Sequence, residues 1–89
     1  MRIVVKGFAY RTSGRFAPFD EFEKAFDASS LAGEVALPLQ ECAFAFKGGE
    51  VLFRFGEERQ TLPLEKGETK TAKAQRNVLG VEVSFTLIE

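Results

Sequence analysis

Histidine and tryptophan are absent from this 89-residue chain, and Cys42 is its only cysteine. Without histidine the chain lacks the commonest general base and the commonest metal ligand. One cysteine excludes a disulfide within the chain. We expect Cys42 to be a buried thiol, because its neighbours place it on an apolar face, and not a reactive nucleophile.

Long apolar runs are also missing, and the run at residues 3–5 is typical of the longest. A membrane-spanning helix needs about 20 consecutive apolar residues, so we expect no membrane span and no membrane partner. The first eight residues, MRIVVKGF, lack the apolar segment and the small-residue cleavage site of a secretory signal. These features predict a cytoplasmic location.

Catalytic and cofactor-binding motifs are not found. The sequence has no Ser/His/Asp or Cys/His set, no GxGxxG and no glycine-rich phosphate loop. Glu57 and Glu58 are adjacent, but in a turn they point apart into water, whereas general acid–base catalysis needs a carboxylate in a desolvating pocket. We therefore expect a non-enzymatic protein with no catalytic residues, no cofactor and no metal. An enzyme that uses carboxylates from distant strands is the remaining alternative.

The most specific feature that is present is a predicted β-hairpin over residues 41–55. Gly48-Gly49 suits a two-residue turn, because glycine supplies the positive φ angles of the favoured hairpin turns. The resulting register puts every large apolar pair on one face, and small residues, a Lys/Glu pair and an arginine on the other. A slip of one residue would destroy this separation. The predicted pairs are Lys47 with Glu50, Phe46 with Val51, Ala45 with Leu52, Phe44 with Phe53, Ala43 with Arg54 and Cys42 with Phe55.

Two further segments have strand patterns. Residues 3–10 have apolar side chains at both odd and even positions, which is typical of a central strand covered on both faces. Gly7 within it indicates a bulge or a close backbone approach. Residues 79–87 alternate cleanly between apolar and small or polar side chains, so we expect one buried and one wet face.

Residues 18–30 predict the single helix. Phe19, Phe22 and Phe26 stand at i, i+3 and i+7, which lie on one face of a helix. Pro18 suits the first helical position, and acidic residues follow in the first turn. The phenylalanine stripe is expected to dock on the sheet.

Two shorter strand patterns contain a proline, which has no N–H to donate. Residues 35–39, with Pro38, are expected to lie at a sheet edge or to bend before Cys42, and residues 62–64, with Pro63, are expected to form an edge strand. A turn at residues 56–59 is expected to bring Leu62 opposite Phe53. The same register brings Leu64 opposite Val51. Residues 65–77 are expected to form a long loop or an exposed hairpin extension.

Together these patterns predict one α+β domain over residues 1–89. Its twisted, mainly antiparallel sheet has about five to six strands, in the order β-α-β-β-β-β, with one amphipathic helix packed on one face.

The first functional hypothesis rests on a surplus of phenylalanine. Ten phenylalanines in so short a chain exceed what one helix face and one sheet face need. A dense core and a cavity for an apolar ligand are the alternatives, but we favour protein–protein interaction through self-association, with a homo-oligomer, preferably a dimer, as the partner. The candidate interaction surface contains Phe8, Tyr10 and Phe16.

The alternative hypothesis is weak nucleic-acid binding by the basic segment 66–76. Its cations would track phosphates by non-specific attraction, although the segment lacks an aromatic residue for base stacking. A solvated loop that aids solubility is the simpler interpretation. The candidate residues are Lys66, Lys70, Lys73 and Arg76.

Overall fold

The structure is a computed structural model that describes residues 1–14 and 17–89. Over these residues the chain forms eight strands and one short 3-10 turn, without an α-helix. In chain order the elements are β1 (Arg2–Arg11), β2 (Phe19–Asp27), η1 (Ala28–Ser30), β3 (Val35–Ala36), β4 (Cys42–Lys47), β5 (Glu50–Phe55), β6 (Glu58–Pro63), β7 (Thr69–Arg76) and β8 (Leu79–Ile88).

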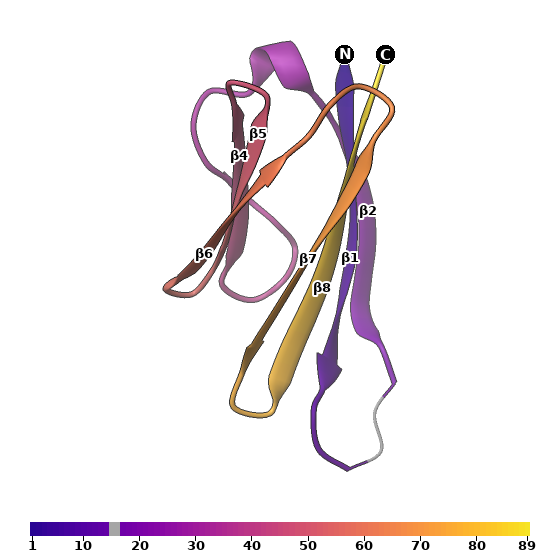
Figure 1. The fold of residues 1–89 in the computed structure, drawn as a ribbon. Coiled ribbons are helices and arrows are strands. Elements are labelled where there is room, and N and C mark those ends of the chain that lie inside the picture. Colours follow the sequence, from indigo (N-terminus) through magenta and orange to yellow (C-terminus); the bar gives the residue numbers. More distant parts are fainter. Residues whose placement is uncertain (15–16) are drawn as a thin grey trace.

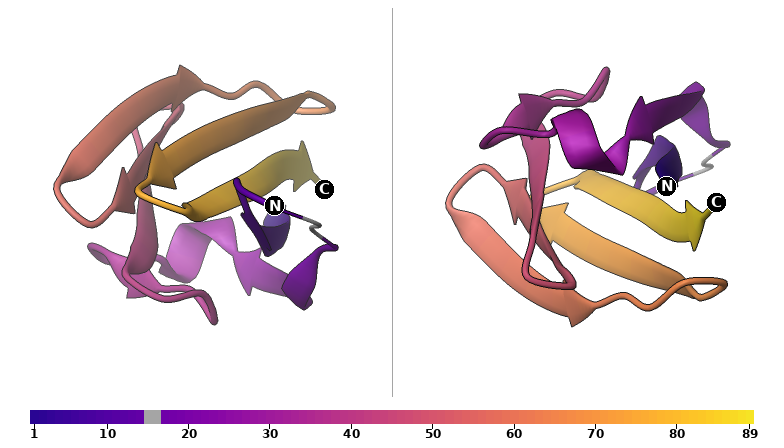
Figure 2. Two further views of the ribbon diagram at one scale, coloured as in Figure 1. Left: turned by 90° about the horizontal axis from the view of Figure 1, so that it is seen from below. Right: turned by 90° about the horizontal axis from the view of Figure 1, so that it is seen from above.

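The strands form two four-stranded antiparallel sheets that face each other, as Figures 1 and 2 show. Sheet A has the order β2-β1-β8-β7, and sheet B has the order β3-β4-β5-β6. Sheet A joins the N-terminal hairpin to the C-terminal hairpin through the pairing of β1 with β8. Sheet B is the meander between them in the sequence. The predicted α+β class, with its five to six strands and one helix, is therefore wrong, and the described chain is a β-sandwich.

The segment predicted as a helix is the edge strand β2. A regular strand would point Phe19 away from Phe22 and Phe26, because its side chains alternate with period two. Gly7 of β1 pairs with Phe22, however, and Ala9 pairs with Phe19. Over two residues of β1 the strand β2 therefore advances by three, so it contains one extra residue. Asp20 has a φ of 54° at this bulge. The bulge restores all three rings to the inner face, so a spacing of three and four residues arises here without a helix.

Gly7 of β1, next to the bulge, makes a close backbone approach, as its place in the sequence predicted. A Cβ atom there would lie 2.8 Å from the carbonyl oxygen of Glu82 and 3.0 Å from the ring of Phe22. The strand is central, between β2 and β8, as predicted, but the other sheet covers only its inner face, and the side chains of Val4, Phe8 and Tyr10 on its outer face are half-buried.

The hairpin of β4 and β5 is confirmed pair by pair, from Cys42 with Phe55 to Lys47 with Glu50. Its inner rings meet sheet A in one core. Phe44 is fully buried, with its ring centroid 5.2 Å from that of Phe26 and 5.4 Å from that of Phe85. Phe53 lies 6.0 Å from Phe85. The apolar residues of β8 face this core, as their alternation predicted.

In the second half of the chain the predicted register of β6 is wrong, and of the two alternatives for residues 65–77 the structure has a hairpin and not the long loop. β6 follows a two-residue turn, so Val51 faces Leu62 and Phe53 faces Gln60, a shift of two residues from the predicted register. Residues 65–77 are not one long loop, since β7 occupies most of them and pairs along its whole length with β8. The buried positions of β7 are alanines, Ala72 and Ala74, whose apolar signal in the sequence is weak.

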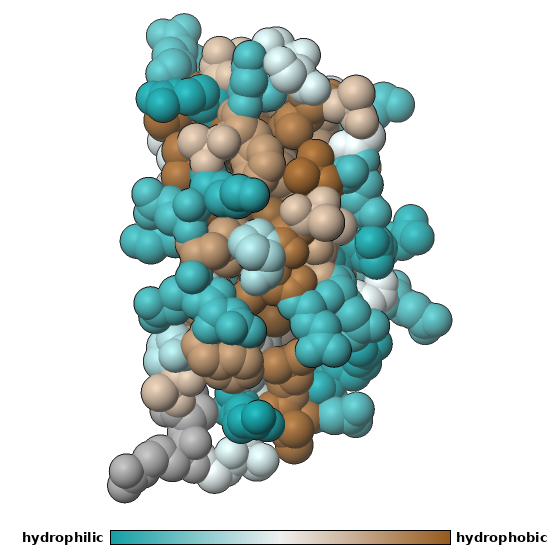
Figure 3. Space-filling model, turned by 180° about the vertical axis from the view of Figure 1, so that it is seen from behind, coloured by the Kyte–Doolittle hydropathy of each residue, from teal (hydrophilic) through white to brown (hydrophobic). Residues whose placement is uncertain are grey.

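The two sides of the sandwich are closed differently. On one side the amide Nε2 of Gln60 in β6 donates to the carbonyl oxygen of Lys73 in β7, at 2.7 Å. On the other side residues 28–34 cross from β2 to β3, and Figure 3 shows an apolar stripe that runs along this side between polar flanks. Half-buried side chains that pack on the core there include Phe19, Phe22, Phe26, Leu31 and Val35.

Candidate functional site

The four basic residues predicted to track phosphates do not form one surface. Lys73 points to the outer face of sheet A. Lys70 and Arg76 alternate with it and lie on the same face of β7 as the buried alanines. Lys66 pairs with Glu89 at 2.6 Å, and Lys73 pairs with Glu82 at 3.6 Å. Three of the four cations, including Arg76, thus already have an acidic partner. Nucleic-acid binding by this set stays a prediction, and the charge pairing counts against it.

Arg76 contributes to the structure of the sandwich. Its guanidinium donates to the carboxylate of Glu41 in the loop before β4. The same group lies 5.7 Å from the ring centroid of Phe55 and fills the space next to Gly56. Since Arg76 belongs to sheet A and these three neighbours belong to the sheet B segment, the side chain joins the two sheets at one end.

Phe8 and Tyr10, two of the three residues predicted for the interaction surface, lie on the outer face of β1. Their ring centroids are 6.2 Å apart, and both side chains are half-buried. The Tyr10 ring covers Gly80 of β8, where a Cβ atom would lie 2.3 Å from the ring. The ring therefore packs against the sheet surface. Phe16, the third predicted residue, lies outside the described residues.

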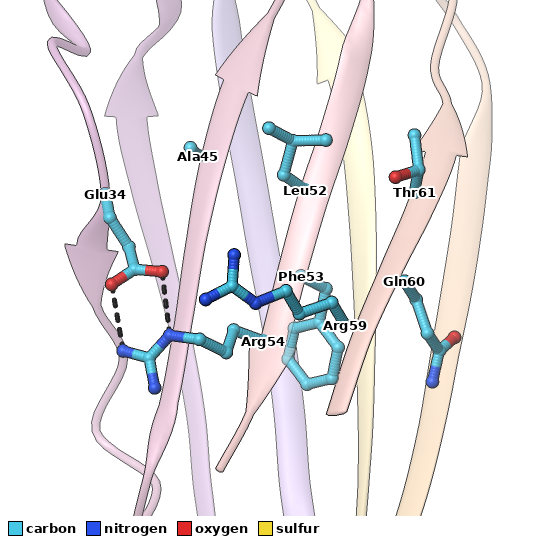
Figure 4. A pocket seen from close by; sticks show the side chains of 8 residues that line it. All are labelled: Glu34, Ala45, Leu52, Phe53, Arg54, Arg59, Gln60 and Thr61. Atoms are coloured by element: carbon cyan, nitrogen blue, oxygen red, sulfur yellow. Dashed lines mark hydrogen bonds and ion pairs between the residues drawn. The ribbon is translucent and has the colours of Figure 1, made fainter. Parts of the chain in front are cut away.

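The outer face of sheet B contains a shallow depression that we call the sheet B trough. It consists of two hollows of about 420 Å³ and about 480 Å³ that share Ala45 and Leu52 as a floor. Figure 4 shows the first hollow and the side chains around it. Strand alternation explains the floor, because Val51 and Phe53 of β5 turn inward and leave Leu52 outside, with 42% of its surface exposed. The charged rim of the trough consists of Glu34, Lys47, Arg54 and Arg59.

A bidentate ion pair forms part of this rim. Arg54 donates from Nε and Nη2 to the two carboxylate oxygens of Glu34, at 2.9 Å and 2.8 Å. These hydrogen bonds lower the pKa of Glu34, and the charge of Arg59 lowers it further. The same pair raises the pKa of Arg54. The ion pair thus favours the ionised form of Glu34, and each of its two oxygens accepts one hydrogen bond from Arg54.

Arg59 has no such partner. It lies directly opposite Arg54 on the neighbouring strand, where two like charges are unfavourable. Within residues 1–14 and 17–89 its side chain makes no ion pair or hydrogen bond. Figure 4 shows it reaching from β6 across β5, so that its guanidinium lies between Leu52 and the Glu34–Arg54 pair. With three cations and one anion, the rim has a surplus of two positive charges in a chain whose net charge is −1.

The trough was not identified from the sequence. The predicted hairpin correctly gave its outer face small residues and an arginine, but the shifted register of β6 concealed that Arg54 and Arg59 face each other. A two-residue turn at Gly56-Glu57 was the signal that would have placed them together, because Gly56 has the positive φ that such turns require.

Other chemistry on the described surface is limited. Burial raises the pKa of the Cys42 thiol to about 11, so the thiol stays protonated at neutral pH. Among residues 1–14 and 17–89, no group of three or more acidic, cysteine or histidine side chains is placed to hold a metal ion. In the same residues, no helix is long and apolar enough to cross a membrane.

Comparison of the chain with protein-family models, curated proteins and solved structures finds no match.

Proposed function

We propose that this chain is a non-enzymatic, cytoplasmic protein-binding domain, and that the sheet B trough holds a partner segment with both apolar and acidic side chains. The observation that carries the proposal is the position of Arg59, whose side chain makes no ion pair or hydrogen bond within residues 1–14 and 17–89 and lies beside an exposed apolar floor.

The apolar component of the partner follows from the floor. Leu52 and Ala45 leave an apolar surface between two neighbouring strands, and its depth comes from the small side chain of Ala45. Apolar area removed from water contributes roughly 25 cal/mol per Å². A leucine-sized or phenylalanine-sized side chain that lies in the trough would remove both this floor and itself from water.

The acidic component follows from the rim. Arginine presents N–H groups in a planar fork that fits a carboxylate, and charge-assisted hydrogen bonds are about twice as strong as neutral ones. Arg54 already binds Glu34, and the side chain of Arg59 makes no ion pair or hydrogen bond within residues 1–14 and 17–89, so its guanidinium can receive a second carboxylate. That carboxylate would also relieve the repulsion between the two opposed arginines.

A peptide-binding measurement tests the proposal. The probe is a fluorescein-labelled peptide in which glutamate alternates with leucine, and the readout is fluorescence anisotropy. Replacing Arg59 with glutamine removes a hydrogen bond to a charged group, which is worth about 1.5 to 3 kcal/mol, so we expect affinity to fall by about 10- to 150-fold.

The matched control is Arg2→Gln, which makes the same change of charge at an exposed position of sheet A. We expect this variant to bind like the original chain. A peptide with glutamine in place of glutamate should bind weakly to both. Equal binding by the Arg59→Gln variant, or equal binding of the glutamine peptide, would refute the proposal.

A further inference from the structure

We infer that the partner segment enters the sheet B trough as a short strand added to the edge of β4, where its backbone hydrogen-bonds to Phe46. From there the segment crosses the trough, and a carboxylate further along it reaches Arg59. The inference rests on the proposed function, and it adds how the backbone of the partner is held.

The backbone groups of β4 alternate between its two neighbouring strands, because successive residues of a strand point their N–H and C=O groups to opposite sides. The amide of Gly56 donates to the carbonyl oxygen of Glu41 at 2.9 Å, so the odd-numbered residues face β5. The amide of Leu37 donates to the carbonyl oxygen of Cys42 at 2.9 Å, so the even-numbered residues face β3. The N–H and C=O groups of Phe46 therefore point to the side of β3.

β3 is too short to cover this edge. It pairs only with Ala43 and Phe44. If β3 continued, the same register would place Gly33 opposite Phe46, but Gly33 has a φ of 89°, which is outside the range of a strand. Within residues 1–14 and 17–89 no backbone hydrogen bond joins Phe46 to another segment on this side. The edge is open at Phe46, where an added strand would satisfy one donor and one acceptor.

The larger hollow of the trough lies at this edge. Its volume is about 480 Å³, and its lining combines Leu31 and Gly33, from the segment before β3, with Phe46 and Lys47 at the end of β4. Phe46 shares its row with the buried Val51, so a residue added beside Phe46 points to the inner face and favours an apolar side chain. The next residue lies beside Lys47 on the outer face and favours a carboxylate. The edge thus suits a segment in which apolar and acidic residues alternate.

The trough leads from this edge to Arg59. Its two hollows share Ala45 and Leu52, and Figure 4 shows the guanidinium of Arg59 next to Leu52. A strand added beside β4 would lie two strand spacings from β5, about 10 Å, which about three extended residues span. In an alternating segment, the third residue after an apolar one is acidic. One short segment can therefore bond to Phe46 through its backbone and to Arg59 through a carboxylate.

The other sheet edges have features that discourage strand addition. At the edge of β7, the amide of Gln60 already donates to the carbonyl oxygen of Lys73. β6 ends in Pro63, which has no N–H to donate. β2 contains the bulge near Asp20. Phe46, by contrast, lies beside a hollow with apolar and cationic side chains.

Two N-methylated forms of the labelled glutamate–leucine peptide test the inference by fluorescence anisotropy. One has a methyl group on each leucine nitrogen, and the other has one on each glutamate nitrogen. A methyl group removes the N–H, and in an added strand only every second N–H faces β4. Because leucine lies beside Phe46, the leucine-methylated peptide should bind at least about 10-fold more weakly than the unmethylated one. The glutamate-methylated peptide is the matched control and should keep its affinity.

Amide hydrogen exchange of the ¹⁵N-labelled chain provides a second readout. At saturating peptide, the N–H of Phe46 should exchange at least about 10-fold more slowly, because it then donates to a carbonyl oxygen of the peptide. The control is Ala45, whose N–H already points to β5 and should exchange at the same rate with and without the peptide.

Equal affinities for the two methylated peptides, or tighter binding of the leucine-methylated one, would overturn the inference. Unchanged exchange at Phe46 would also overturn it. The Arg59→Gln variant separates this failure from failure of the proposed function. If the unmethylated peptide binds through Arg59 but the methylated peptides do not differ, the trough holds its partner by side chains alone and only the added strand is wrong. If the unmethylated peptide does not bind, both proposals are wrong.

Discussion

The outer faces of the two sheets differ in one cross-strand pair, although sheet B also has complementary pairs, since Lys47 faces Glu50 and Arg54 binds Glu34. On sheet A, cross-strand neighbours complement each other: Thr71 and Ser84 share a hydrogen bond of 2.8 Å, Lys73 pairs with Glu82, and Lys6 approaches Glu23. On sheet B, Arg54 faces Arg59 across the sheet.

This difference separates a surface that stabilises the fold from one that is left for a partner. Matched cross-strand pairs each contribute roughly 0.2 to 1 kcal/mol, and opposed like charges cost a similar amount. Sheet A gains from its outer face, whereas on sheet B an arginine that makes no ion pair among the described residues and an exposed leucine line the same hollow. Such an arrangement is unfavourable in the isolated chain and becomes favourable when a carboxylate and an apolar group arrive together.

The largest expected effect distinguishes the inner from the outer face of sheet B. Phe44→Ala should lower the free energy of unfolding by about 3 to 5 kcal/mol, because its ring is fully buried between Phe26 and Phe85. Leu52→Ala, on the outer face, should change it by less than about 0.5 kcal/mol. Urea denaturation measures both. Similar losses for the two variants would contradict the assignment of the two faces.

The next effect concerns the packing of sheet A. Gly7→Ala should lower the free energy of unfolding by about 1 to 3 kcal/mol, because the added Cβ atom would lie 2.8 Å from a backbone oxygen of β8. Thermal unfolding measures the loss, with Lys6→Ala at the neighbouring exposed position as the control. An unchanged midpoint for Gly7→Ala would show that β1, β2 and β8 are not packed as closely as described.

The ion pair on sheet B predicts a dependence of stability on pH. Hydrogen bonds from Arg54 lower the pKa of Glu34 below its ordinary value of 4.5. The folded state therefore favours the carboxylate: its contribution is present above pH 4.5 and is lost as the pH falls through the lowered pKa. Unfolding midpoints measured across this range should fall less steeply for Glu34→Gln than for the original chain. Parallel profiles would show that the pair does not form in solution.

The smallest expected effect is a gain in stability when a surface arginine is removed. Arg59→Thr removes one of two opposed positive charges and introduces a residue that favours strands, so it should raise the free energy of unfolding by up to about 0.5 kcal/mol. The same variant should lose binding of the acidic peptide. Thr71→Ala, the matched change on sheet A, should reduce stability slightly, because its partner Ser84 is left without that hydrogen bond. A loss of stability in both variants would show that the two outer faces do not differ in this way.

Local patterns predicted the sheet B hairpin because two constraints agreed. The Gly48-Gly49 turn and the alternation around it both require Phe44 to face Phe53, and the structure has this register. The strand at residues 79–87 was equally clear, since its alternation places Val83 and Phe85 in the core. The buried state of Cys42 followed from the same hairpin.

The remaining parts depend on information that a local pattern does not contain. Phe19, Phe22 and Phe26 follow helical spacing, and only the pairing with β1 shows that a bulge produces it. β7 was predicted only as part of a hairpin that was the alternative to a long loop, because its buried residues are alanines, which are acceptable in either a helix or a loop. The trough needed both the register of β6 and the placement of Glu34, which lies 20 residues from Arg54 in the chain. It is thus a property of the tertiary structure.

An amide chemical-shift map of the uniformly ¹⁵N-labelled chain, taken during titration with the glutamate–leucine peptide, tests the division between the two faces most directly. We expect the shifts to concentrate on residues 31–34 and on β4 to β6 around Ala45, Leu52 and Arg59. The outer positions of β7 and β8 should stay unchanged. Shifts that centre on Phe8, Tyr10 and the threonine rows of sheet A, with the trough unaffected, would contradict the account.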